Sequence, residues 1–145
     1  MTAQEQETIF RRWIAAHLGL ILKVVRGCTA AQQDQDDLFQ DVCLQLWQSI
    51  PAFRGEAKET TWIYRVAFNT ALTWRRGERR RREGQETFLK FDMSPRIQQS
   101  HADTLQEQEI VERLYTIIRQ LPKVDASLAL LHLDGQSYSI YRMTV

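Results

Sequence analysis

The chain has 145 residues, of which 43% are hydrophobic and 26% charged, a composition typical of one soluble globular domain or two small ones. It has no apolar run of about eighteen residues, and its start, MTAQEQETIF, lacks the order of a secretory signal, so we expect a cytoplasmic protein without membrane insertion. Two cysteines, Cys28 and Cys43, are too few for a zinc site, and we expect both to be reduced and packed.

The net charge of +1 conceals an uneven distribution along the chain. Residues 1–50 contain four Lys/Arg and six Asp/Glu, residues 51–82 contain nine and three, and residues 83–145 contain six and nine. The middle third is therefore basic between two mildly acidic flanks, a segregation that indicates a negatively charged partner.

The first predicted element is a helix. Gly and Pro are few and most apolar residues recur at helical spacing, so we expect an all-α protein. The first helix is expected over about residues 5–28. Its predicted apolar face contains Phe10, Trp13, Ile14, His17, Ile21, Val25 and Cys28.

The second predicted helix begins within DQDD, where Asp34 or Asp36 can cap it, and runs to about Ser49 before Pro51. Its predicted buried stripe contains Phe39, Val42, Cys43, Leu46 and Ile50. Residues 52–59, AFRGEAKE, then form a short loop around Gly55.

The third predicted helix starts at a cap on Thr60 or Thr61 and extends to about Arg82. One side, the predicted core stripe, contains Ile63, Val66, Ala67, Thr70, Ala71 and Trp74. The opposite side contains Arg65, Asn69, Leu72 and Arg76, flanked by Trp62 and Thr73. Guanidinium, amide and indole groups on one strip are the side chains that contact phosphates, bond base edges and stack on unpaired bases.

A basic run follows this strip and contains Arg75, Arg76 and Arg79 to Arg82, which would extend a track for phosphates. An alternative is that an arginine-rich helix end is simply solvated and complements the negative end of the helix dipole. The two tryptophans can equally be core residues.

The last third of the chain is predicted to contain a linker and two helices. Residues 84–103 are polar and include Pro95. Residues 104–120 place Leu105, Ile110, Leu114, Ile117 and Ile118 in helical register. Pro122 starts the next helix, which we expect to stop at Asp134–Gly135.

The order of these pieces resembles one protein family. DLFQDVCLQLW (37–47) followed by AFRGEAKETTWIYRVAFNTALTWRR (52–76) is similar to region 2 of bacterial sigma factors of the extracytoplasmic-function type. ERLYTIIRQLPKVDASLALLHLDGQSY (112–138) is similar to the start of region 4. The resemblance implies an all-α region 2-like bundle over residues 1–83, a linker over 84–103, and a partial region 4 over 104–145.

Family members continue after this point with a recognition helix that reads the minus-thirty-five element in the major groove. Here the chain continues as SYSIYRMTV, with Ile140 and Tyr141 where the next turn would begin. We therefore expect the recognition helix to be absent.

The resemblance also implies roles for individual residues. Asp37, Gln40, Asp41 and Trp47 match positions that meet the clamp helices of the largest RNA polymerase subunit. Trp62, Arg65, Asn69 and Arg76 match positions that contact the opening minus-ten element, and Arg79 and Arg80 would continue this contact. Phe53, Arg54, Gly55 and Lys58 match the loop that holds a base flipped from the non-template strand.

The polymerase-facing residues have a plainer interpretation as well. Asp37 and Asp41 also suit the N-terminal half of a helix, where negative charge is favourable, and Trp47 can be a core residue. Surface charges of this kind usually contribute little to stability.

The implied function is that of a transcription initiation factor that binds core RNA polymerase and recognises and melts the minus-ten element, with an anti-sigma factor as a further expected partner. An enzyme is not expected, because His17, His101 and His132 have no metal or triad spacing, and no cofactor or metal is predicted. Two alternatives remain: a helical nucleic-acid-binding module without polymerase contact, and a protein-interaction bundle that never contacts DNA.

Overall fold

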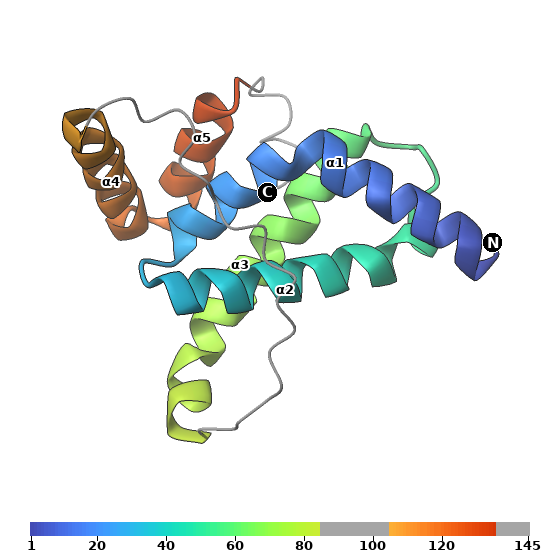
Figure 1. Cartoon of the computed structure of the whole chain (residues 1–145), viewed down its shortest axis with the longest axis horizontal. Coiled ribbons are helices and arrows are strands. Elements are labelled where there is room, and N and C mark those ends of the chain that lie inside the picture. The colour runs from blue at the N-terminus through green and yellow to red at the C-terminus, as the bar shows by residue number, and fades with distance from the viewer. Residues whose placement is uncertain (85–104, 136–145) are drawn as a thin grey trace.

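The computed structural model describes residues 1–84 and 105–135, with side chains described for 1–77 and 105–135 (Figure 1). All regular elements in these ranges are helical, which confirms the predicted all-α class. They are α1 (Ala3–Cys28), α2 (Gln32–Ser49), the short 3-10 helix η1 (Ile50–Ala52), α3 (Glu59–Gly84), α4 (Leu105–Gln120) and α5 (Lys123–Leu133). The predicted linker from Gln85 onward and the segment after Gly135 lie outside the described residues.

Helix α1 starts with a capping box and changes direction in its middle. The Thr2 hydroxyl accepts a hydrogen bond from Glu5 N at 3.1 Å, and the Glu5 carboxylate accepts one from Thr2 N at 2.9 Å. At His17 the backbone leaves the helical region, with φ −123° and ψ 19°.

The second half of α1 is buried on two sides, which the prediction of a single apolar face missed. It contacts both the α2–α3 pair and the α4–α5 pair (Figure 1). Leu20 and Val24 are therefore buried beside the predicted Ile21 and Val25, whereas His17 is only half-buried.

Helix α2 begins earlier than predicted. Its N-cap is Ala31, which offers no side-chain hydrogen bond, so the expected caps at Asp34 and Asp36 were wrong. The buried Gln35 amide donates to the carbonyls of Thr29 at 3.1 Å and Ala30 at 3.3 Å and so holds the tight α1–α2 turn. The predicted buried stripe of α2 is confirmed, with Leu38 added to it.

Helix α3 begins at Glu59, so both threonines expected to cap it lie inside its first turn. The predicted core residues Ile63, Ala67, Ala71 and Trp74 are buried, whereas Val66 and Thr70 are half-buried. The prediction missed Tyr64 and Phe68, which are also buried and stack at 5.7 Å between ring centroids. Tyr64 is covered because α5 reaches it: the Tyr64 hydroxyl lies 2.8 Å from Ser127 Oγ.

Helices α4 and α5 share the core of the first three helices. Tyr115 and Ile118 of α4 and Leu130 and Leu131 of α5 are buried in the same hydrophobic cluster as α1 to α3. Helix α5 ends as predicted, at Asp134 and a Gly135 with φ 72°.

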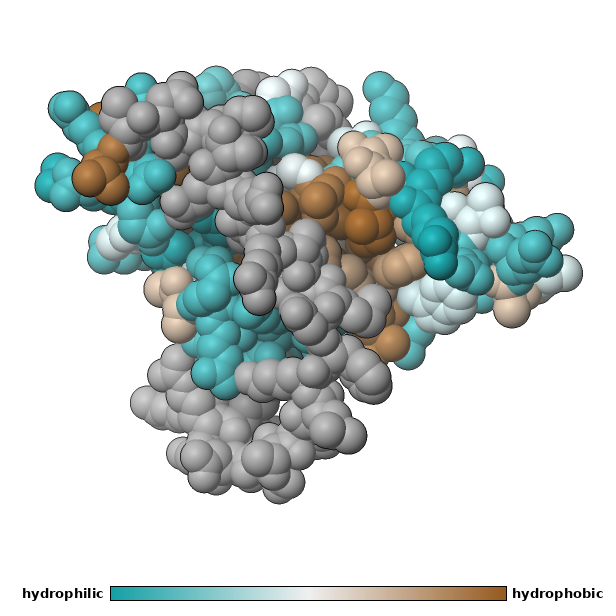
Figure 2. All heavy atoms as spheres, in the orientation of Figure 1, coloured by the Kyte–Doolittle hydropathy of each residue, from teal (hydrophilic) through white to brown (hydrophobic). Residues whose placement is uncertain are grey.

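The predicted apolar register of α4 was wrong for most of its members. Leu105, Ile110, Leu114 and Ile117 are exposed, by 84%, 59%, 38% and 57% respectively, and brown atoms of α4 reach the surface in Figure 2. The helix contacts α1 through Tyr115 and Ile118, which lie on another side of it.

Polar contacts complete the attachment of α4 and α5 to α1. Lys23 Nζ lies 2.6 Å from Asp134 Oδ1, and Arg26 lies 3.2 Å from the Glu112 carboxylate. The Arg26 guanidinium carbon also stands 4.3 Å from the centroid of the Tyr115 ring. None of the helices described is long and apolar enough to cross a membrane.

Candidate polymerase and nucleic-acid interface

The outer face of α2 is the first of two candidate surfaces. Helical spacing places Asp37, Gln40 and Asp41 on this face, opposite the buried stripe, and all three are half-buried. Leu44 lies among them and is 52% exposed. An exposed leucine within a polar, acidic face gives a partner both charge complementarity and an apolar anchor.

Sequence reasoning missed Leu44, although the sequence carried a signal for it. Within α2, position 44 falls on the same side as Asp37 and Asp41, so an apolar residue there cannot belong to the buried stripe.

Trp47, also predicted to face polymerase, connects α2 with the start of α1. Its ring meets Phe10 edge-on at 5.6 Å between centroids, and its carbonyl accepts a hydrogen bond from Gln6 Nε2 at 2.7 Å. The ring is half-buried, so only part of it is available at the surface.

The second candidate surface is a strip along α3. Trp62 and Arg65 are half-buried, whereas Asn69, Thr73 and Arg76 are exposed. Their spacing places them on one side of the helix, away from the buried side. The predicted member Leu72 is half-buried at the edge of the strip, and the side chains of Arg79 and Arg80 lie outside the described residues.

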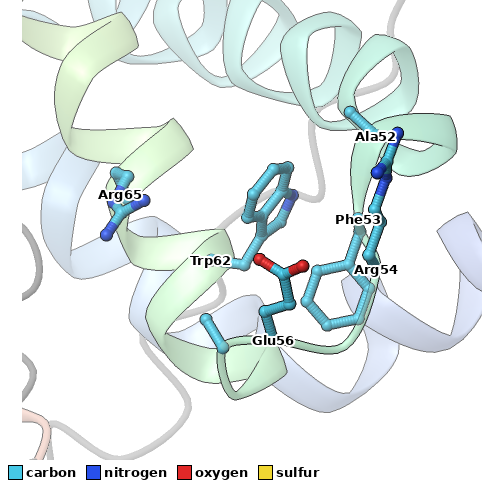
Figure 3. Close-up of a pocket in the computed structure, with 7 residues that line it drawn as sticks. Ala52, Phe53, Arg54, Glu56, Trp62 and Arg65 are labelled. Atoms are coloured by element: carbon cyan, nitrogen blue, oxygen red, sulfur yellow. The ribbon is translucent and has the colours of Figure 1, made fainter.

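A pocket of about 340 Å³ lies where η1, the following loop and the first turns of α3 meet (Figure 3). It is lined by Ala52, Phe53, Arg54, Glu56, Ala57, Trp62 and Arg65. Its volume lies in the range of small-ligand sites. Of the four predicted loop residues, Phe53 and Arg54 line the pocket, and Gly55 and Lys58 do not.

Gly55 has a different role in the loop. Its φ of 75° is a left-handed conformation that favours glycine, and it lets the chain reverse between Arg54 and Glu56. Both of these charged residues can therefore line the same pocket.

The pocket walls combine aromatic and charged groups. Figure 3 shows the Trp62 indole projecting from α3 with the Phe53 ring of the loop beside it, and the Arg65 side chain a turn further along the helix. Aromatic rings can stack on a base, arginines can bind phosphates, and the Glu56 carboxylate can accept hydrogen bonds from an exocyclic amino group of a base. Glu56 was not among the predicted residues.

The buried titratable groups lie away from both surfaces. Burial raises the pKa of the Cys28 thiol from its ordinary value of 9.0 to about 11, although Arg75 and Arg119 partly oppose this. Burial likewise raises the pKa of Cys43 to about 11. Burial also raises the pKa of the Tyr64 hydroxyl. All three are neutral near pH 7 and act as packing groups.

The described residues hold no group of three or more His, Cys, Asp or Glu side chains placed to bind a metal ion. His17 lies in the middle of α1 and His132 near the end of α5, while His101 lies outside the described residues.

Comparison with known proteins places both surfaces within one family domain. Residues 13–81, from α1 to the basic end of α3, match the family model of sigma-70 region 2. The matched range contains the α2 face, the α3 strip and the pocket, whereas α4 and α5 lie beyond it.

Several curated sigma factors are similar to the chain. The ECF RNA polymerase sigma factor SigG of Mycobacterium tuberculosis is 40% identical over 53 residues, which cover 37% of this chain and 14% of SigG. The RNA polymerase sigma-H factor of Pseudomonas aeruginosa is 28% identical over 128 residues, covering 83% and 64% of the two chains. The ECF RNA polymerase sigma-E factor of Haemophilus influenzae is 25% identical over 115 residues, covering 74% and 61%.

The chain thus spans less than two thirds of the length of these relatives. No solved structure matches it at a significant level. Residues 13–81 thus match sigma-70 region 2, and the chain is similar over part of its length to sigma factors that include members of the extracytoplasmic-function group.

Proposed function

We propose that the chain acts in transcription initiation by binding core RNA polymerase and stabilising the melted minus-ten element of a promoter. The observation that carries this proposal is the pocket at the start of the α3 strip, because it combines an aromatic wall with charged groups that suit an unpaired nucleotide. Acidic and basic faces on neighbouring helices allow a protein partner and a nucleic acid to bind together.

The proposed polymerase surface is the outer face of α2, with Asp37, Gln40 and Asp41. Leu44, exposed among them, would supply an apolar anchor against the arginine-rich clamp helices. Trp47 would contribute only the part of its ring that Phe10 leaves uncovered.

The proposed DNA surface is the α3 strip with its pocket. A base flipped from the non-template strand would enter beside Trp62 and Phe53, while Arg54 and Arg65 bind neighbouring phosphates. Asn69 and Arg76 would contact the strand further along the helix, and Arg79 and Arg80 would extend the track. Flipping costs a few kcal/mol of unstacking, which stacking and hydrogen bonds in the pocket would offset.

Partners and organisation complete the proposal. Residues 1–83 would form the polymerase- and DNA-binding unit, and residues 104–145 a region 4-like unit, of which α4 and α5 pack against α1. Such a factor would act in the cytoplasm beside RNA polymerase, without catalysis of its own. An anti-sigma factor would be a further partner.

A charge-reversal experiment tests the DNA surface. The complex of the chain with core RNA polymerase would be titrated with short fluorescent single-stranded DNA, using Arg76→Glu on the strip. Arg113→Glu is a matched control, because Arg113 is exposed on α4, away from the strip. We expect Arg76→Glu to weaken binding about tenfold and to reduce its salt dependence, since it removes a phosphate contact.

Equal loss in both variants would indicate a general charge effect and contradict the proposed strip. A nucleic-acid module without polymerase contact is the second candidate, favoured by the same basic strip. It predicts that the chain binds the DNA equally well when no polymerase is present and never joins the polymerase.

A further inference from the structure

The last residue of α2, Ser49, is hydrogen-bonded to the indole that walls the pocket. Trp62 Nε1 donates to Ser49 Oγ at 3.1 Å, and Ser49 Oγ donates to the Leu46 carbonyl at 2.8 Å. Both bonds are partly buried. The hydroxyl therefore links Trp62, at the start of α3, to the last turn of α2.

A second contact holds the same indole from the loop. The Phe53 ring meets Trp62 at 5.4 Å between centroids with an interplanar angle of 60°. Phe53 is itself braced by the fully buried Trp13, edge-on at 5.4 Å. An aromatic chain thus runs from the core to the pocket, and it fixes the position of the Trp62 ring together with the Ser49 bond.

We propose that Ser49 is a positioning residue for the pocket, an inference that rests on the proposed function. A ring contact with Phe53 does not by itself fix the direction of Nε1, whereas a hydrogen bond from Nε1 favours one orientation of the indole. Because the Trp62 indole is already held in place before a base binds, binding does not carry the entropic cost of ordering this side chain.

This arrangement also connects the two candidate surfaces. Ser49 and Leu46 belong to the helix whose outer face carries Asp41 and Leu44, so the shape of the pocket depends on the last turn of α2. Trp62 donates its hydrogen bond to the Ser49 hydroxyl and not to the α2 backbone. The Ser49 hydroxyl in turn donates to the Leu46 carbonyl of α2.

The test uses two substitutions in the full chain bound to core RNA polymerase. Ser49→Ala removes the hydroxyl, and Ser49→Thr keeps it. Each complex is titrated with a short single-stranded DNA that carries a central adenine, and with the same DNA carrying an abasic site at that position. The ratio of the two affinities measures how well the pocket binds a base.

We expect the wild-type chain to bind the adenine DNA more tightly than the abasic DNA. In Ser49→Ala the ratio of the two affinities should fall on the order of fivefold, which corresponds to the loss of one hydrogen bond. Ser49→Thr should retain it. If the wild-type chain prefers the adenine DNA and Ser49→Ala shows the same ratio of affinities, the role of Ser49 is overturned and the proposed function stands. A wild-type chain that binds both DNAs equally would overturn the base pocket and the Ser49 inference with it.

A spectroscopic measurement on the free chain separates positioning from general stability. With 5-fluorotryptophan incorporated, the fluorine resonance of Trp62 is assigned by its loss in Trp62→Phe. We expect this resonance to shift and broaden in Ser49→Ala and to return in Ser49→Thr, while those of Trp13 and Trp74 stay unchanged. An unmoved Trp62 resonance in Ser49→Ala would overturn the inference, whatever the DNA affinities.

Discussion

Leu130 Cδ2 of α5 lies 2.7 Å from the point at which a Cβ on Gly27 of α1 would stand. Leu130 is fully buried, so its side chain has little space into which to retreat. Glycine at position 27 therefore allows α5 to pack closely against α1.

Gly27→Ala should destabilise the chain by about 1–3 kcal/mol, because the added methyl group overpacks this contact. Gly19→Ala is the matched control in the same helix, since apart from its chain neighbours and the adjacent backbone of α1 no described atom lies within 4 Å of the point at which its Cβ would stand. The control should be neutral or stabilising by up to about 1 kcal/mol, because alanine favours the helix. Urea unfolding of both variants measures the difference, and equal stability would contradict the close approach.

The buried bond between Tyr64 and Ser127 joins α3 to α5. Tyr64→Phe removes the hydroxyl that pairs with Ser127 Oγ. Because Ser127 is only 1% exposed, water cannot replace this partner. We expect a loss of about 1 kcal/mol in unfolding free energy. In the double variant Tyr64→Phe, Ser127→Ala, part of this loss should be recovered because no polar group stays unsatisfied. Additive losses in the cycle would argue against the bond.

Stability should fall in alkaline solution because of the buried thiols. The pKa of Cys28 and of Cys43 is raised in the folded chain to about 11, so between pH 9 and 11 the unfolded chain releases protons that the folded chain retains. Unfolding is then favoured as pH rises, and the stability present below pH 9 is progressively lost. The loss from Cys28 is on the order of 2 kcal/mol.

Urea unfolding at several pH values checks this prediction. Cys28→Ala is less stable at neutral pH because of the cavity it leaves, so its slope against pH is the informative quantity. We expect a shallower decline between pH 9 and 11 in this variant than in the wild-type chain. Parallel curves would show that Cys28 does not titrate differently in the two states.

We expect Glu56 to give the proposed base pocket a preference among bases. Its carboxylate accepts hydrogen bonds, so it should favour adenine, cytosine or guanine, which present an exocyclic amino group, over thymine, which does not. Glu56→Gln should reduce this preference severalfold in the complex with core polymerase, without lowering overall affinity for DNA. Competition among DNAs that differ only in the central base measures it, and an unaltered preference would remove Glu56 from base reading.

The sequence predicted the elements better than their contacts. The buried stripe of α2 and the end of α5 at Asp134–Gly135 followed from helical spacing and turn chemistry, because these depend on neighbouring residues. Tyr64 was missed because α5, distant in sequence, reaches it, and Leu20 because α1 contacts two pairs of helices. The same cause exposed Ile110 and Ile117, since α4 contacts α1 through another of its sides.

The α3 strip was predicted from helical spacing and side-chain chemistry, whereas the loop residues Phe53 and Arg54 were predicted only through the family motif. The motif residues Phe53, Arg54, Trp62 and Arg65 do line one pocket. Glu56 was missed because a loop residue has no periodicity to reveal its direction. The bond between Ser49 and Trp62 joins two helix ends across a loop, and neither residue carries a sequence signal for it.

Binding of the chain to core RNA polymerase is the decisive test of the proposed role in transcription initiation. Fluorescence anisotropy would compare the wild-type chain with Asp41→Lys, on the α2 face, and with Glu109→Lys, an equal charge change on the exposed part of α4. Trp47 is left intact because its ring packs against Phe10. We expect the wild-type and Glu109→Lys chains to bind and Asp41→Lys to lose about tenfold or more in affinity. A folded wild-type chain that does not bind core polymerase would contradict the proposed role.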